Sequence, residues 1–170
     1  MGDSYRIDDA IRVVRAALLT ASILPAIALA MWRWIPGLQN CTFPYLGGEW
    51  TGRLVFEGSR GKGSRDIQLK ISHSLFHLTL ILETAESASR TLVAHAEYDK
   101  GLDVNRIYYV YLTERKEGVP GAGAQYKGLA TLRIGKAEAA LYGDYFTEQQ
   151  TMGKLHAWRA RPYPAWQFWK

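Results

Sequence analysis

The chain has a single cysteine, Cys41, among its 170 residues. One thiol excludes an internal disulfide framework and the multi-cysteine kind of zinc cluster. The sequence also lacks the Gly-x-Ser-x-Gly elbow of serine hydrolases, the Gly-Lys-Ser type of phosphate-binding loop, internal repeats and low-complexity tails. Its length allows one domain with a short appendage, and we expect no enzymatic activity.

We expect structural roles, not catalytic or metal-binding ones, for three other groups of chemically reactive side chains. His73 and His77 have helical spacing but fall around a turn between strands, so we expect no metal site. The segment 58–65 resembles a phosphate cradle, yet no helix start follows it, and a flexible hairpin loop is expected. Glu83 and Glu86 flank a strand end, where paired-carboxylate chemistry is not expected.

Long apolar runs are also scarce, because the sequence has only one, at residues 17–32. A helix needs about 20 apolar residues to span a bilayer, and the run reaches that length once its apolar neighbours are included. Trp32 and Trp34 would supply an interfacial aromatic belt. We therefore predict a membrane anchor in residues 1–36. A signal peptide, which would need small residues after the run, and a buried core helix are the alternatives.

After residue 36 the apolar period changes to two, which is typical of β-strands. We predict a linker at 37–45, a β-barrel at 46–161 and an aromatic tail at 162–170. Eight short strands close a small antiparallel up-and-down barrel, and a sandwich is less favoured because no crossover is evident. The expected strands lie at residues 50–57, 66–71, 76–84, 92–98, 106–113, 126–134, 141–147 and 152–159.

The side chains predicted to face the barrel interior include many polar and aromatic residues, where a packed core would favour Leu, Val and Ile. Either the tyrosines pack with hydroxyl partners, or they line a pocket for a flat anionic ligand. Aromatic rings stack nucleobases, and arginine binds phosphate with two hydrogen bonds. A net charge of +5 also favours anionic partners, or reflects a basic solvated surface. The interior set is Trp50, Thr84, Tyr109, Tyr111, Thr113, Tyr126, Tyr145, Thr147 and Arg159.

A set of short motifs, in order along about residues 46–160, resembles a known family. That family is the membrane-anchored β-barrel effectors of bacterial cyclic-oligonucleotide-based anti-phage signalling (CBASS). The matching motifs are Leu46-Gly-Gly-Glu-Trp-Thr-Gly52, Thr84 with Ser87 and Ser89, Tyr109-Val-Tyr111, Lys127-Gly128, and Leu141-Tyr-Gly-Asp-Tyr-Phe-Thr147 with Gly153.

The resemblance implies a mechanism. The barrel would bind a cyclic di- or trinucleotide, the protein would oligomerise with itself, and its membrane segments would disrupt the inner membrane and kill the infected cell. The implied partners are the cyclic oligonucleotide, membrane lipid and further copies of the chain, with no DNA or RNA polymer, no cofactor and no metal. The barrel would face the cytoplasm. The ligand would meet Tyr109, Tyr111, Tyr145, Thr147 and Arg159 first, together with Trp50, Thr84 and Tyr126.

Three features depart from the family pattern. The family commonly has two membrane helices, whereas this chain has one clear run. Gln149 stands where a basic residue is expected, so either Arg159 or Arg133 would hold phosphate or the ligand preference would differ from that of the family. More arginines precede the apolar run than follow it, which favours a barrel outside the cytoplasm. An extracytoplasmic, lipocalin-like carrier of an apolar ligand is therefore the rival hypothesis, and an envelope scaffold with a filled barrel is a third.

Overall fold

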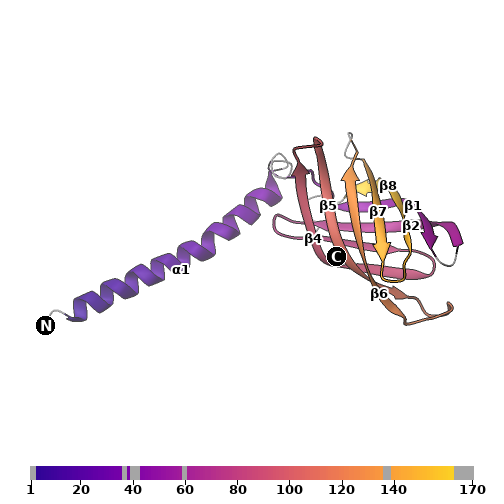
Figure 1. Cartoon of the computed structure of the whole chain (residues 1–170). Coiled ribbons are helices and arrows are strands. Elements are labelled where there is room, and N and C mark those ends of the chain that lie inside the picture. Colours follow the sequence, from indigo (N-terminus) through magenta and orange to yellow (C-terminus); the bar gives the residue numbers. More distant parts are fainter. Residues whose placement is uncertain (1–2, 36–37, 39–42, 59–60, 136–138, 163–170) are drawn as a thin grey trace.

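The computed structural model describes residues 3–35, 38, 43–58, 61–135 and 139–162. Cys41 and most of the predicted aromatic tail lie outside the described residues. One helix, α1 (Asp3–Trp34), precedes eight strands and extends away from them (Figure 1). The strands are β1 (Gly48–Gly58), β2 (Gly61–His73), β3 (Leu78–Glu83), β4 (Ser87–Asp99), β5 (Val104–Arg115), β6 (Gln125–Ile134), β7 (Ala140–Thr147) and β8 (Met152–Pro162).

The eight strands form a closed barrel in sequence order. Each strand pairs antiparallel with the next, and β8 pairs antiparallel with β1. Closure satisfies the hydrogen-bonding groups that an open sheet would leave at its two edges. The predicted up-and-down barrel is therefore confirmed, and the sandwich alternative is wrong.

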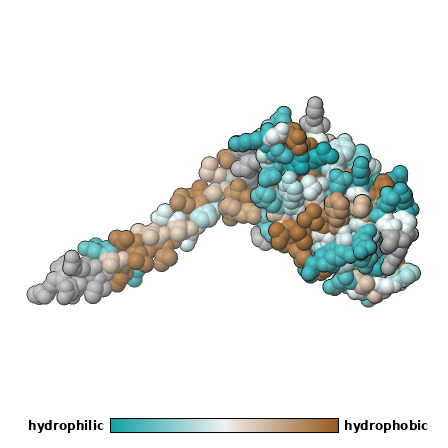
Figure 2. Space-filling model, viewed as in Figure 1, coloured by the Kyte–Doolittle hydropathy of each residue, from teal (hydrophilic) through white to brown (hydrophobic). Residues whose placement is uncertain are grey.

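Helix α1 contains a segment, Asp8–Trp32, that is long and apolar enough to cross a membrane. Apart from Trp32 at its end, this segment is not buried against the rest of the chain. Figure 2 shows hydrophobic residues along much of the helix, in contrast to the mostly hydrophilic barrel surface beside it. The predicted N-terminal apolar helix is confirmed, and its exposure argues against the alternative of a buried core helix.

Strands β3 and β4 do not begin where the sequence predicts. Phe76 is 71% exposed in the turn before β3, which starts at Leu78. Strand β4 starts at Ser87, before the predicted position, and a bulge interrupts its pairing with β5 between Thr91 and Val93. A bulge adds one residue and so reverses which alternate side chains face inward.

The bulge in β4 is supported by a side chain. The Thr91 hydroxyl accepts a hydrogen bond from the Leu80 amide and donates one to the Leu80 carbonyl, each at 2.9 Å. Before the bulge, Ser87 and Ser89 are buried on the inside. After the bulge the partly buried apolar side chains are those of even-numbered residues, Ala94 and Ala96. A single alternation of inward and outward side chains therefore does not hold along the whole strand.

The half of the barrel nearest the helix is filled by large apolar side chains. Trp50 is 1% exposed, and its indole nitrogen donates to the Leu46 carbonyl at 3.0 Å. Gly52 and Gly143 make this packing possible, because a Cβ atom at either position would collide with the backbone of a neighbouring strand. The largest buried side chains of this filled half are Leu46, Trp50, Leu69, Ile71, Leu80, Ile107, Leu132 and Leu141.

An aromatic cluster joins the helix to this end of the barrel. Trp32, which is 3% exposed, contacts His73 edge-on with ring centroids 5.8 Å apart. Tyr45 stacks on the same His73 ring at 5.5 Å, and Phe43 meets it edge-on at 6.2 Å. The His73 Nδ1 atom accepts a hydrogen bond from the Leu46 amide at 3.2 Å. The end of α1 is thus packed against the filled half.

Candidate ligand-binding site

A cavity of about 440 Å³ occupies the other half of the barrel, at the end remote from the helix. Strand β1 shows this polarity, because it starts at Gly48 beside the filled end and finishes at Gly58 on the cavity wall. The lining consists of Leu54, Phe56, Gly58, Gly61, Arg65, Leu82, Thr84, Ser87, Ser89, Tyr109, Tyr111, Thr113, Arg115, Tyr126, Tyr145, Thr147, Gln149, Thr151 and Leu155.

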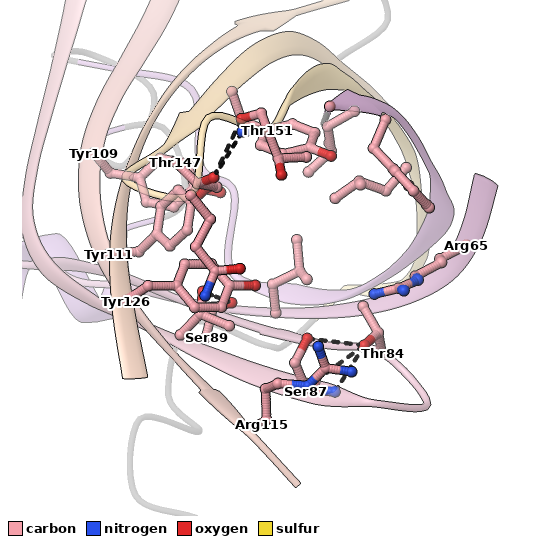
Figure 3. Close-up of a pocket in the computed structure, with 18 of the residues that line it drawn as sticks. Arg65, Thr84, Ser87, Ser89, Tyr109, Tyr111, Arg115, Tyr126, Thr147 and Thr151 are labelled. Carbon is pink, nitrogen blue, oxygen red and sulfur yellow. Dashed lines mark hydrogen bonds between the residues drawn. The ribbon is translucent and has the colours of Figure 1, made fainter. Parts of the chain in front are cut away.

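Tyrosine rings form one wall of the cavity (Figure 3). The rings of Tyr109 and Tyr111 lie 5.5 Å apart and are tilted against each other. Gly153 leaves room for the ring of Tyr145, because a Cβ atom there would lie 2.6 Å from the ring carbon Cε1. Burial raises the pKa of Tyr109, Tyr111 and Tyr145 well above the usual value, so these phenols stay neutral and can donate hydrogen bonds.

A chain of hydroxyl groups lines the cavity beside the tyrosines. Ser89 and Thr113 share a hydrogen bond of 2.8 Å between their hydroxyl oxygens, and both side chains are buried. Thr84 and Ser87 share another, at 3.0 Å. The Thr147 hydroxyl accepts from the Thr151 amide at 3.2 Å. These groups can exchange partners with a ligand that carries hydroxyl or base-edge atoms.

Two arginines supply positive charge to the cavity. Arg65 of β2 lies on the opposite side of the opening from the tyrosines (Figure 3), with its guanidinium carbon 4.9 Å from the centre of the Phe56 ring. Arg115, at the end of β5, approaches near Ser87 (Figure 3). The Arg115 Nε atom is buried without a hydrogen-bond partner among the described residues. A buried donor of this kind costs free energy unless an acceptor, such as a ligand oxygen, is supplied.

Six of the eight predicted ligand-binding residues line this cavity. They are Thr84, Tyr109, Tyr111, Tyr126, Tyr145 and Thr147. Gln149, at the position where the family resemblance suggested a basic residue, also lines it.

Trp50 and Arg159 face the interior as predicted but lie in the filled half, outside the described cavity lining. The Arg159 guanidinium carbon lies 4.7 Å from the centre of the Trp50 ring, and its Nη2 atom donates to the Tyr45 carbonyl at 2.6 Å. Arg133, the other predicted substitute for the missing basic residue, is exposed on β6. The alternation of side chains identified the interior, but it carried no information about height along the barrel axis.

Arg65 and Arg115 were missed because two strands are longer than the sequence predicts. Strand β2 begins at Gly61, within the segment expected to be a flexible loop, and β5 extends to Arg115. Arg65 has the parity of Ile67, and Arg115 has the parity of Thr113, so both would have been found had the inward alternation been continued outward. No group of three or more potential metal ligands occurs among the residues that the structure describes.

The barrel sequence matches a known protein family. Residues 41–159 match the family model described as "Cap15, cyclic dinucleotide receptor domain". The chain belongs to the Cap15 family. The match covers most of the chain and nearly all of the barrel, so it confirms the resemblance to membrane-anchored CBASS effectors. No curated protein matches the chain.

Proposed function

We propose that this Cap15 chain is a membrane-tethered sensor that binds a cyclic dinucleotide in its barrel cavity, with the six predicted lining residues as ligand contacts. One observation carries the proposal: tyrosines, hydroxyls and two arginines converge on a single cavity. The cavity volume falls within the usual range for small-molecule sites. The receptor family to which the barrel belongs supports the same ligand class. The polar lining disfavours the apolar-ligand carrier, and the cavity disfavours the scaffold with a filled barrel.

In this proposal each kind of side chain has one task. The rings of Tyr109, Tyr111 and Tyr145 stack on the bases, an interaction worth about 1–3 kcal/mol per base. Arg65 and Arg115 hold phosphate oxygens through charge-assisted hydrogen bonds. The hydroxyls nearby select the ribose and base-edge atoms.

The proposed location is the bacterial inner membrane with the barrel in the cytoplasm. The cavity opens at the end of the barrel remote from α1, so a membrane that contains the helix would leave the opening accessible to water. The arginines before the apolar run favour the opposite orientation. A reporter fused to the C-terminus, active only in one compartment, tests the orientation, and a periplasmic signal would contradict the sensor function.

We further propose that ligand binding drives self-association, which brings the membrane segments together and disrupts the bilayer. A closed barrel has no free strand edge, so a second copy must dock on side chains. The outer surface offers a continuous apolar row of cross-strand neighbours over β4 to β8. This apolar row consists of Val93, Val110, Leu129, Phe146 and Met152.

The composition of the apolar row and its surroundings fits a homotypic interface. Phe146 is 52% exposed and Met152 is 55% exposed, although both are large apolar side chains. The neighbouring outward rows carry both signs of charge: Lys127 on one side, and Asp144 beside Lys154 on the other. An apolar centre with a charged rim of both signs lets one patch face a second copy of itself.

The binding proposal is tested by titrating full-length protein in detergent with cyclic di-GMP, cyclic di-AMP and cyclic GMP–AMP. We expect one of them to bind, and Arg115→Gln to weaken its binding at least tenfold, because a charged hydrogen bond to phosphate is lost. Arg133→Gln removes the same charge on the outer surface and should leave the affinity unchanged. No binding by any of the three, with the protein folded, would contradict the proposal.

The self-association proposal is tested by replacing Phe146, in the middle of the apolar row, with Glu. With ligand present, the wild-type protein should form a larger assembly on analytical ultracentrifugation, whereas Phe146→Glu should stay small and still bind ligand. Val55→Glu is the matched control, because Val55 is also about half exposed on the outer surface but lies outside the apolar row. Equal assembly by the wild type and Phe146→Glu would place the interface elsewhere.

A further inference from the structure

Glu86, in the turn between β3 and β4, connects the two arginines of the cavity. Its Oε2 atom forms an ion pair with the Arg65 Nη2 atom at 2.9 Å and accepts a hydrogen bond from the Arg115 Nη2 atom at 3.0 Å. One carboxylate oxygen therefore bridges two guanidinium groups that come from different strands. These three side chains are called the Arg–Glu–Arg triad below.

Two hydrogen bonds hold the backbone of Glu86 in the turn. The Glu86 amide donates to the Thr84 hydroxyl at 3.2 Å, and the Glu86 carbonyl accepts from the Lys116 amide at 2.9 Å. Both arginines line the cavity, whereas Glu86 is outside its described lining. A phosphate that enters the cavity would thus meet the guanidinium groups with the carboxylate held next to them.

The charges of the Arg–Glu–Arg triad add up to +1, from two guanidinium groups and one carboxylate. A phosphodiester carries one negative charge, whereas a terminal phosphomonoester carries about 1.5 to 2 at neutral pH. The triad therefore balances one phosphodiester, and any additional negative charge is repelled by Glu86 at short range. Repulsion of this kind is a common source of discrimination between related ligands.

We propose that Glu86 is a specificity-determining residue that selects phosphodiesters and rejects phosphomonoesters and polyphosphates at the arginine pair. This inference rests on the proposed function, because it takes the cavity as the phosphate site. Ring opening of a cyclic dinucleotide converts one phosphodiester into a terminal phosphomonoester, so the same residue would distinguish the intact ring from its hydrolysis product. It would also reduce competition from ATP.

The test compares three ligands on full-length protein in detergent, without magnesium. They are the cyclic dinucleotide that binds best, the same dinucleotide opened to carry a 5′-phosphate, and ATP. In Glu86→Gln one repulsive charge is removed while an amide oxygen remains to accept from the arginines. We expect the affinity for the cyclic ligand to rise about threefold. Because Coulomb energy is proportional to charge, a doubly charged phosphate should gain about the square of that factor, roughly tenfold.

Glu83→Gln is the matched control. Glu83 precedes the same turn and is similarly exposed, with a side-chain value of 42% against 38% for Glu86, but it pairs with Lys116 at 3.4 Å. We expect Glu83→Gln to leave the ratio of cyclic to opened ligand unchanged. A change in this ratio in Glu86→Gln is a readout that general damage to the site would not produce.

Two results would overturn the inference while leaving the proposed function intact. The first is weaker binding of every ligand by Glu86→Gln, which would mean that Glu86 only supports the arginines. The second is an equal change in affinity for the cyclic and opened ligands. Absence of cyclic dinucleotide binding by the wild-type protein would instead contradict the proposed function itself, so the two failures are distinguishable.

Discussion

The two halves of the barrel are built from the same strands but differ in what occupies their interior. The filled half, next to the helix, contains aliphatic side chains and Trp50, all nearly inaccessible to solvent. The open half holds the cavity, and several of its buried polar groups pair with one another, as Ser89 does with Thr113. Close packing of apolar side chains should stabilise chiefly the filled half, which leaves the open half free to carry polar groups that a ligand can recruit.

Strand β7 shows how one strand serves both halves. Its inward positions run from Leu141, which is fully buried in the filled half, through Gly143 to Tyr145 and Thr147 on the cavity wall. Along the barrel axis, from the filled end to the cavity, the inward side chain changes from leucine to tyrosine and then to threonine. The side chain at each inward position thus reflects its height above the filled end.

Matched leucine truncations, one in each half, should differ most in their effect on stability. Leu132→Ala in the filled half should lower the free energy of unfolding by about 2–5 kcal/mol, because it leaves a cavity that the packed neighbours cannot close. Leu54→Ala on the cavity wall should cost less, because the space it opens joins a cavity that water already reaches. Urea unfolding followed by circular dichroism measures both values. Equal losses would show that the two halves do not differ in their contribution to stability.

The aromatic cluster at the filled end should make stability depend on pH. Burial lowers the pKa of His73 from 6.5 to about 4, so the folded state holds this ring neutral. The unfolded chain binds a proton near pH 6.5, and the folded chain does not until about pH 4. Stability from this group is therefore complete above pH 6.5 and is lost as the pH falls toward 4, by on the order of 3 kcal/mol.

Unfolding midpoints measured between pH 7 and pH 4 check this prediction against His73→Asn. That variant keeps an acceptor near the Leu46 amide but does not titrate, so it should remove much of the pH dependence. His77→Gln changes an exposed histidine in the neighbouring turn and should leave the dependence intact. The same slope in the wild type and His73→Asn would assign the effect to other groups.

Most of the fold was predictable because alternation with period two is a local signal. All eight strands and the N-terminal apolar helix were found from sequence. Some errors are strand ends placed too early or too late, and others occurred where the alternation was interrupted. The bulge at Leu92 reverses the parity of β4, and Phe76 occupies a turn although its parity fits a strand. Both depend on which residues the neighbouring strand offers for pairing, which the sequence of one strand does not contain.

The site was predictable in part, for the same reason. Parity placed Tyr109, Tyr111 and Tyr145 in the interior, and the structure brings them to one cavity. Parity placed Arg159 in the interior without showing that it lies in the filled half, and Arg115 was missed because β5 extends past its predicted end. Height along the axis depends on strand tilt and on the pairing of all eight strands, and both follow only from closure of the barrel.

The smallest expected effect separates these two arginines. Arg159→Gln should lower the free energy of unfolding by about 1–2 kcal/mol, because it removes a charged hydrogen bond to the Tyr45 carbonyl and the contact with the Trp50 ring. It should leave cyclic dinucleotide affinity unchanged, whereas Arg115→Gln should reduce affinity at least tenfold. Parallel unfolding and titration of the two variants measure both quantities. Loss of binding in Arg159→Gln at full stability would mean that the ligand reaches into the filled half. The binding site would then extend closer to the helix than the described cavity does.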